Sequence, residues 1–207
     1  MRLILARHGR TASNTDHLID TGAPGADLDR VGQGQAQALR ERLGGRPITA
    51  VYASSLVRSQ QTARPLAQAL GLPVSILDGL REVSAGQWDQ VKVDTPGQPN
   101  PYTTMLLAWL DGDRSASLPG GETADQFITR FDAALATVEA ADPDLALIVS
   151  HGSALLIWCS ERVAGFAELS PAPWFGHVGH IEVEGSLAAG LRLVDAASIA
   201  GWTPDPA

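Results

Sequence analysis

The chain is poor in cysteine, in basic residues and in long apolar runs, and each shortage excludes a class of protein. Cys159 is the only cysteine among 207 residues, so no intrachain disulfide can form and a reducing compartment is expected. Lysine and arginine total 15 against 23 aspartates and glutamates, which gives a net charge of -8 and a pI near 5.0. Such a chain is not expected to bind nucleic acid or an anionic membrane, although a local arginine cluster can still attract a small anion.

The first apolar run is too short for export or for crossing a membrane. Leu3–Ala6 spans four residues and is followed at once by Arg7, whereas a signal peptide or a membrane span needs a much longer apolar segment. We therefore expect a cytoplasmic protein. Hydrophobic residues make up 44% of the chain, and its length predicts a single domain over residues 1–200, followed by a mobile, proline-containing tail at 201–207.

Two short apolar runs end in the same way. Leu3–Ala6 is followed by an Arg-His-Gly triplet that contains His8, and Leu145–Val149 is followed by a Ser-His-Gly triplet that contains His151. Continuously apolar strands are typical of parallel neighbours, whose carboxyl ends meet at one edge of the sheet. Because ligands of open α/β sheets bind outside that edge, we expect His8 and His151 to lie side by side there.

The rest of the chain alternates between strand-like and helix-like segments. Strands are predicted over 48–53 and 74–77, and a hairpin is predicted over 178–184 and 187–194 with its turn at Gly185-Ser186. Helices are predicted over about 30–43, 54–70, 102–110, 124–138 and 153–164. This order favours a three-layer α/β/α sandwich around a mostly parallel sheet with at least one antiparallel strand.

Three features modify this pattern. Pro65 lies inside the helix predicted over 54–70 and predicts a kink or a break there. Residues 89–118 combine glycines, prolines and one short helix, which is typical of a lid-like insert, and Trp109 on this insert is the tryptophan most expected to touch a substrate. Glu122 is interpreted as an acidic residue at the positive end of the next helix, with a contact to the site arginines as the alternative.

If the strands ending near residues 6, 53, 77 and 149 share one edge, five ionisable side chains converge beside it. They are Arg7, His8, Arg58, Glu82 and His151. Two arginines suit phosphate or carboxylate, two imidazoles can supply a nucleophile and a cationic donor, and one carboxylate can supply a proton. No pair of acids stands ready to hold magnesium, so the set predicts phosphoryl transfer through a phosphorylated histidine, without a metal or another cofactor.

At this point the chain resembles the histidine phosphatase superfamily, also called phosphoglycerate mutase-like. The segment from Arg7 to Thr11, together with Asn14, is similar to the family signature Arg-His-Gly-x-Thr-x-x-Asn. The other blocks follow in the family's order: Leu28 with Gly32, Gln35 and Ala36; Ser54-Ser55-x-x-Arg58-Ser59-x-x-Thr62-Ala63; Leu80-x-Glu82 with Gly86 and Trp88; Pro119-Gly120-Gly121-Glu122; and Ser150-His151-Gly152. Arg-His-Gly alone is a weak signal, but the ordered set is specific.

The resemblance implies a role for each matching residue. His8 would be the nucleophile that takes the phosphoryl group. Glu82 would protonate the leaving oxygen and then deprotonate the water that hydrolyses phosphohistidine. The groups that would bind the phosphoryl oxygens are Arg7, Arg58, His151, Asn14 and the backbone N–H of Gly152.

Three segments depart from the family pattern. Arg10 stands where the family often has Glu or Gln, so it would either bind a second anionic group of the substrate or lie as a solvated rim residue. Thr21 and Gly22 lie near where phosphoglycerate mutases touch substrate, with a slightly shifted spacing. His177 and His180 stand where the family often has Asn-x-Ser or Asn-x-Gly, and their spacing alone does not predict a metal site.

The sequence therefore predicts a phosphomonoester phosphatase that acts on a small phosphorylated metabolite. The alternative is a cofactor-dependent phosphoglycerate mutase, which needs a closed and basic lid, yet Lys92 and Arg114 are the only basic residues between Glu82 and Glu122. A more remote alternative is a non-catalytic binding module on the same fold. Exposed edge strands would permit a homodimer, and no partner other than the small substrate is expected.

Overall fold

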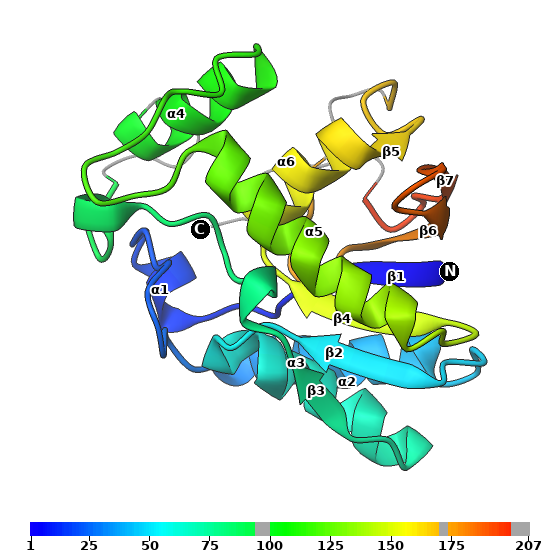
Figure 1. The fold of residues 1–207 in the computed structure, drawn as a ribbon. Helices are drawn as coiled ribbons and strands as arrows, with labels where there is room; N and C mark the ends of the chain where they lie inside the picture. Colours follow the sequence, from blue (N-terminus) through cyan, green and yellow to red (C-terminus); the bar gives the residue numbers. More distant parts are fainter. Residues whose placement is uncertain (94–99, 170–173, 200–207) are drawn as a thin grey trace.

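A seven-stranded sheet forms the centre of the computed structural model, which describes residues 1–93, 100–169 and 174–199 (Figure 1). The strand order is β3-β2-β4-β1-β6-β7-β5. The strands are β1 (Arg2–Arg7), β2 (Ala50–Ala53), β3 (Val74–Ile76), β4 (Ala146–Ser150), β5 (Val163–Ala164), β6 (His180–Ser186) and β7 (Gly190–Asp195). The first four strands pair in parallel, whereas β6 is antiparallel to both β1 and β7. This arrangement confirms the predicted fold class.

Helices cover both faces of the sheet. They are α1 (Ala12–Thr15), α2 (Arg30–Leu43), α3 (Val57–Leu70), α4 (Pro101–Leu110), α5 (Ala124–Ala140) and α6 (Gly152–Arg162), with 3₁₀ turns at Asp78–Leu80 and Gly86–Trp88. In Figure 1, α5 crosses in front of the sheet and α2 and α3 lie behind it. None of the helices in the described ranges is both long and apolar enough to cross a bilayer.

The residues of β1 explain why two covering layers are needed. Leu3 and Leu5 belong to the hydrophobic core formed with α5 and α6, whereas Ile4 and Ala6 belong to the core formed with α2 and α3. Successive side chains of a strand point to opposite faces, so a continuously apolar strand is stable only when both faces are covered. The apolar residues Leu3–Ala6 of β1 therefore require a layer of helices on each face of the sheet.

The central pair of parallel strands positions the candidate site. β1 and β4 pair in register up to Arg7, which lies opposite Ser150. His8 and His151 each follow directly, and the backbone N–H of His8 donates to the Ser150 carbonyl at 3.0 Å. Both histidines therefore leave the sheet at the same edge.

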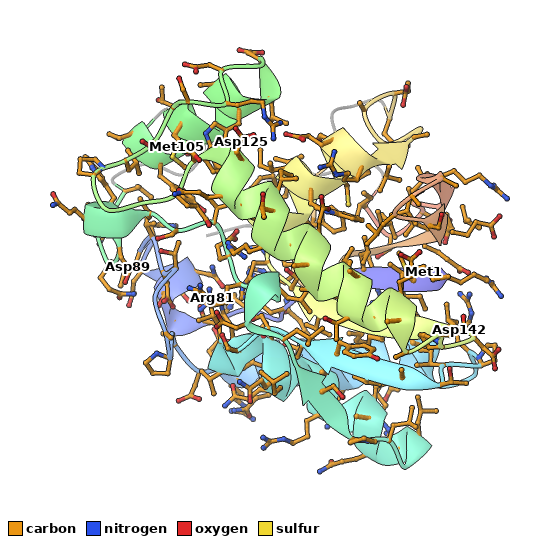
Figure 2. The ribbon with its side chains drawn as sticks, in the orientation of Figure 1. Met1, Arg81, Asp89, Met105, Asp125 and Asp142 are labelled. Carbon is orange, nitrogen blue, oxygen red and sulfur yellow. The ribbon has the colours of Figure 1, made fainter. Side chains whose placement is uncertain are left out.

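The two ends of the sheet are separated in Figure 2. Arg81 and Asp89 lie towards the end where the parallel strands finish, and Met1 and Asp142 lie at the opposite end. A cavity of about 700 Å³ is lined partly by Met1 and Asp142. This cavity is therefore remote from the edge at which His8 and His151 emerge.

The predicted break at Pro65 is wrong. α3 runs continuously from Val57 to Leu70 with Pro65 inside it. A proline removes one backbone hydrogen bond of the helix. The buried face of α3 packs against α2 and the sheet, and this tertiary packing stabilises the helix more than the missing bond weakens it.

The hairpin is present, but its predicted turn is wrong. β6 continues through Gly185 to Ser186, and the chain turns over residues 187–189. The N–H of Gly185 donates to the Met1 carbonyl at 3.1 Å. Gly185 is therefore a paired residue of the sheet, because its N–H forms a hydrogen bond with Met1 rather than within a turn.

The helix of the insert packs on the body of the protein. Tyr102, Met105 and Trp109 of α4 are buried, and Trp109 stacks on Phe127 of α5 with ring centroids 6.1 Å apart. The prediction that Trp109 touches substrate is wrong, because its ring completes the core between α4 and α5. Residues 94–99 of the insert and the predicted tail at 201–207 lie outside the described residues.

Candidate active site

Three histidine rings gather where the parallel strands end. The ring centroids of His8 and His151 are 5.1 Å apart, and those of His8 and His177 are 6.2 Å apart. His8 is 4% exposed and His151 is fully buried. The predicted meeting of His8 and His151 is confirmed, whereas His177 was not expected at this place.

The hydrogen bonds of His8 define which nitrogen can react. Nδ1 lies 2.7 Å from the Gly9 carbonyl, and because a carbonyl only accepts, Nδ1 carries the proton. Nε2 therefore keeps its lone pair, towards which Nε of Arg58 donates at 3.1 Å. Burial lowers the pKa of His8 well below its ordinary value, and the nearby charge of Arg58 lowers it further. His8 is thus a neutral imidazole with a nucleophilic Nε2.

His151 is held by Ser54, in the turn that precedes α3, and Ser54 is itself contacted by Ser59 of α3. Its Nε2 lies 2.7 Å from Oγ of Ser54, which in turn lies 2.7 Å from Oγ of Ser59. Its Nδ1 has no hydrogen-bond partner among the described residues. Burial, and then Arg58, lower the pKa of His151 well below its ordinary value. A bound dianion would favour the protonated ring, so His151 can serve as a cationic donor when phosphate is present.

Arg58 is the buried cation of the site. It lies on α3, is 2% exposed, and donates through Nη2 to the Asp20 carbonyl at 2.7 Å. The Asp20 carboxylate lies 3.5 Å from Nη1. Burial lowers the pKa of Arg58, whereas Asp20 and Glu82 oppose that shift. The guanidinium is thus fixed in orientation between the nucleophile and the loop that contains Asp20.

Arg7 lies against the start of α6. Its Nη1 donates to the Phe175 carbonyl at 2.8 Å, and its guanidinium carbon lies 5.9 Å from the ring centre of Trp174. A Cβ at Gly152 would lie 3.3 Å from Nε of Arg7, which is a tight contact. Glycine at position 152 therefore lets the arginine pack directly on the N-terminus of the helix, where backbone N–H groups favour an anion.

Glu82 is bound at the same helix N-terminus. Its Oε1 accepts from the N–H of Val83 at 2.9 Å and of Ala154 at 2.7 Å, and its Oε2 accepts from Ser153 at 3.2 Å. Burial raises the pKa of Glu82 above its ordinary value, while these N–H groups and Arg58 pull it back. Since Oε1 already accepts two hydrogen bonds, a proton is best placed on Oε2. Glu82 therefore suits the role of general acid.

Arg130 of α5, which the sequence did not single out, holds the backbone that carries Glu82. It donates to the carbonyls of Gly79 at 2.7 Å, Arg81 at 2.9 Å and Glu82 at 2.9 Å. Glu122 pairs with Arg130 at 2.6 Å. The prediction that Glu122 precedes the helix is confirmed, and its contact is with Arg130 rather than with the predicted site arginines. The sequence signal that could have identified Arg130 is its position as a charged residue beside the apolar stripe of the helix predicted over 124–138.

Replacing Arg130 with methionine is expected to lower the free energy of unfolding by about 2–4 kcal/mol. The change leaves the Glu122 carboxylate, which is 13% exposed, without its ion-pair partner. It also frees the backbone beside Glu82, so turnover should fall as well. Urea unfolding and steady-state kinetics measure the two effects. The double variant with Glu122→Met should regain part of the stability, and a single variant as stable as the parent would contradict this role.

Asn14 and Arg10 follow His8 closely in the chain and make contacts of their own. Oδ1 of Asn14 accepts from the N–H of Thr11 at 3.0 Å and faces Nε2 of His177 at 3.1 Å. Nε of Arg10 donates to the Asp29 carboxylate at 2.8 Å, with the Arg10 side chain 30% exposed. Arg10 is therefore an ion-paired residue at the rim, and a second anionic group of a substrate would compete with Asp29 for it.

Thr21 and Gly22 are held by a carboxylate in this structure. Oδ1 of Asp89 accepts from the N–H of Thr21 at 2.6 Å, from the Thr21 hydroxyl at 3.0 Å and from the N–H of Gly22 at 3.0 Å. A Cβ at Gly22 would lie 2.6 Å from Oδ2 of Asp89. Asp89, at the start of the insert, therefore holds the loop that contains Thr21 and Gly22. A substrate would have to displace the Asp89 carboxylate to reach these donors.

His8 and His151 are expected to make the folded protein less stable in acid. Both are neutral when folded, with pKa values lowered below 6.5, whereas unfolding restores an ordinary pKa. Below about pH 6.5 the unfolded state therefore binds more protons, and the free energy of unfolding falls by about 1.4 kcal/mol per pH unit for each histidine until the lowered folded pKa is reached.

Urea unfolding at a series of pH values from about 7 to 5 measures this slope. The His151→Asn variant removes one of the two histidines and should show a shallower dependence. An unchanged slope in that variant would contradict a neutral, buried His151.

The site offers donors and proton carriers. Within residues 1–93, 100–169 and 174–199, no three His, Cys, Asp or Glu side chains gather closely enough to hold a metal ion. What the edge presents is a neutral imidazole with its Nε2 lone pair available, two arginines, a second imidazole and a buried carboxylate whose pKa is raised. Such a set can receive a phosphoryl group and stabilise the charge that spreads over its oxygens.

Comparison with known proteins agrees with this chemistry. The model of the histidine phosphatase superfamily (branch 1) matches residues 3–169. The chain is 31% identical over 156 residues to the "Probable phosphoglycerate mutase GpmB" of Salmonella choleraesuis, covering 75% of this chain and 71% of that protein. It is 40% identical over 107 residues to the PE-PGRS family protein PE_PGRS11 of Mycobacterium tuberculosis, covering 51% of this chain and 18% of that protein.

Solved structures of phosphatases share the fold over nearly the whole chain. A mycobacterial glucosyl-3-phosphoglycerate phosphatase in complex with VO3 superposes with a TM-score of 0.75 at 26% identity, covering 96% of this chain and 99% of that one. The alpha-ribazole phosphatase from Shigella flexneri superposes with a TM-score of 0.73 at 29% identity, covering 98% and 100%. The chain therefore belongs to the histidine phosphatase superfamily (branch 1) and is a phosphoric monoester hydrolase.

Proposed function

We propose that the protein hydrolyses a small phosphorylated metabolite through a covalent phosphohistidine on Nε2 of His8, without a metal. The observation that carries this proposal is the hydrogen bonding of His8: Nδ1 is committed to the Gly9 carbonyl, and Nε2 keeps its lone pair beside Arg58. A nucleophile that is already neutral and oriented needs no separate base to activate it.

In the first step, Nε2 of His8 attacks phosphorus and the ester P–O bond breaks. Oε2 of Glu82 gives its proton to the leaving oxygen, so that a neutral alcohol departs. The phosphoryl oxygens are bound by Arg7, Arg58, protonated His151 and the Gly152 N–H. These cations are held in place before the reaction starts, so they stabilise the developing charge without reorganising.

In the second step, water attacks the phosphorus of phosphohistidine. The Glu82 carboxylate takes a proton from this water, the P–N bond breaks, and His8 returns to its neutral form with phosphate released. Glu82 therefore alternates between acid and base: burial raises its pKa and favours the acid form, while the backbone N–H groups and Arg58 favour the carboxylate. Division into two steps lowers the barrier of a slow hydrolysis.

A phosphoglycerate mutase is the second candidate, supported by the name of the Salmonella relative. In a mutase the phosphoryl group on His8 returns to a bound intermediate before water reaches it. That requires a site closed to water and a second binding place for anions. Arg10, the cation at the rim, is paired with Asp29, which favours the phosphatase.

The two candidates differ in their product. With p-nitrophenyl phosphate, a phosphatase releases inorganic phosphate at each turnover, and chelation of metals with EDTA should leave its rate unchanged. A mutase interconverts phosphoglycerates with little release of phosphate. Acid-quenched protein should carry an acid-labile phosphoryl label on His8 in both cases, whereas a non-catalytic binding module would carry none. A rate that depends on added metal would overturn the proposed mechanism.

A further inference from the structure

We infer that His177 is a positioning residue of this site, which holds the carboxamide of Asn14 so that its NH₂ group donates to the bound phosphoryl group. The inference rests on the proposed function and extends it to a residue that departs from the family pattern. It concerns phosphate binding more than the chemical step, because His177 acts through Asn14.

The hydrogen bonds of Asn14 define how its side chain is turned. Oδ1 accepts from the backbone N–H of Thr11 at 3.0 Å, and Nε2 of His177 lies 3.1 Å from the same atom. An N–H donor requires an acceptor, so this atom is the amide oxygen and Nε2 of His177 carries a proton. Nδ2 of Asn14 then points away from both partners, and within the described part of the chain it donates to no protein acceptor.

His177 is close enough to the nucleophile for this to matter. Its ring centroid lies 6.2 Å from that of His8, and its Nε2 lies 3.1 Å from Oδ1 of Asn14, so His177 lies between the Asn14 amide and the surroundings of the His8 ring. Burial lowers the pKa of His177 to about 3, with the charges of Arg7 and Arg10 acting in the same direction. The ring is therefore a neutral donor, and its contact with Asn14 does not depend on titration near neutral pH.

The backbone next to His177 is held in an unfavourable conformation. Val178 has a φ of +53°, a region that a β-branched side chain rarely occupies. The N–H of Arg7 donates to the Gly179 carbonyl at 3.0 Å, so the segment lies along the end of β1. Strain of this kind persists where the surrounding structure enforces it, and it is concentrated at functional sites. Here it turns the chain where His177 faces Asn14.

The test compares His177→Phe, which keeps a ring but loses the donor, with His177→Gln, whose amide can donate from nearly the same place. The probes are p-nitrophenyl phosphate as substrate and orthovanadate as inhibitor. We expect His177→Phe to raise KM and the vanadate inhibition constant by about 5–30-fold, because the hydrogen bond from Asn14 to the charged phosphoryl group is weakened but not removed, with a smaller change in kcat. His177→Gln should stay within about 3-fold of the parent.

His180→Phe is the matched control. It makes the same substitution three residues further along the chain, at the start of β6, where His180 contacts Val178 and Ser198 rather than Asn14. Vanadate binding should be unchanged in this variant. A His180→Phe effect as large as that of His177→Phe would show that the segment containing both histidines acts only through packing, and would overturn the inference.

A double-mutant cycle separates the inference from the proposed function. In an Asn14→Ala background, His177→Phe should change vanadate binding by less than about 2-fold, because the path from His177 to phosphate has been removed. Additive effects would overturn the role of His177 while leaving the phosphatase in place. If the parent protein binds vanadate but shows no turnover, the proposed function fails, and the cycle still tests His177 through binding alone.

Discussion

The His8→Ala variant is expected to lose turnover of p-nitrophenyl phosphate by at least about 10⁴-fold and to carry no acid-labile phosphoryl label. His8 supplies a neutral ring nitrogen whose lone pair faces Arg58, since its Nδ1 is committed to the Gly9 carbonyl. Without it, water would have to attack the phosphate ester directly, and Glu82 could not activate that water while it holds the proton that the leaving oxygen needs.

Phosphate binding should survive in the same variant. Arg7, Arg58 and His151 remain, and removal of the ring takes away a hydrogen-bond acceptor of Arg58 that phosphate can replace. Orthovanadate titration followed by thermal unfolding measures this directly, because a ligand that binds the folded state raises its apparent stability. His180→Ala, which removes a half-buried histidine elsewhere, serves as the control. Residual turnover within about 10-fold of the parent would contradict His8 as the nucleophile.

The Glu82→Gln variant is expected to lower kcat by about 10²–10⁴-fold while vanadate binding changes little. The amide oxygen can still accept from Val83 and Ala154, so the side chain should keep its place at the start of α6. The amide nitrogen would face the N–H of Ser153, and two facing donors should cost the fold about 1–2 kcal/mol. The proton that the leaving oxygen needs is absent.

The pH profile and the leaving group sharpen this prediction. The pKa of Glu82 is raised by burial, so its acid form persists to higher pH than in an ordinary glutamate, and the parent rate should fall as pH rises through that pKa. Glu82→Gln should lack this alkaline limb. The loss of kcat in Glu82→Gln, relative to the parent, should be smaller for p-nitrophenyl phosphate than for an alkyl phosphate. Nitrophenolate is a good leaving group and needs no proton to depart.

Glu182→Gln is the control for removing a buried carboxylate. Glu182 is 6% exposed and pairs with Arg2 at 2.6 Å and Arg46 at 2.5 Å, away from the histidines at the carboxyl edge. This variant should lose stability but keep kcat. An alkyl phosphate hydrolysed by Glu82→Gln at the parent rate would remove Glu82 from the role of general acid.

Predictions from local sequence patterns succeeded where the structure is determined by residues that are close together in the chain. The helix over 30–43 begins at Asp29, whose carboxylate accepts from the Gly32 N–H at 2.7 Å, because a capping residue and the apolar stripe after it are next to each other in the chain. The predicted break at Pro65 and the predicted turn at Gly185 failed because packing of α3 and pairing with Met1 involve distant residues. The prediction that Trp109 contacts substrate failed for the same reason, because Trp109 packs beside Phe127, which is also distant in the chain.

The sequence by itself determined the parallel strands that end in His-Gly and, from the order of its blocks, the five residues of the candidate site. Only the tertiary structure decided which nitrogen of His8 keeps its lone pair, that Glu82 rests on the N-terminus of α6, and that Arg130 and His177 support the site. The physical reason is that a strand is specified by the polarity of its own residues, whereas a tautomer, a pKa or a positioning contact depends on partners that are brought close only by folding.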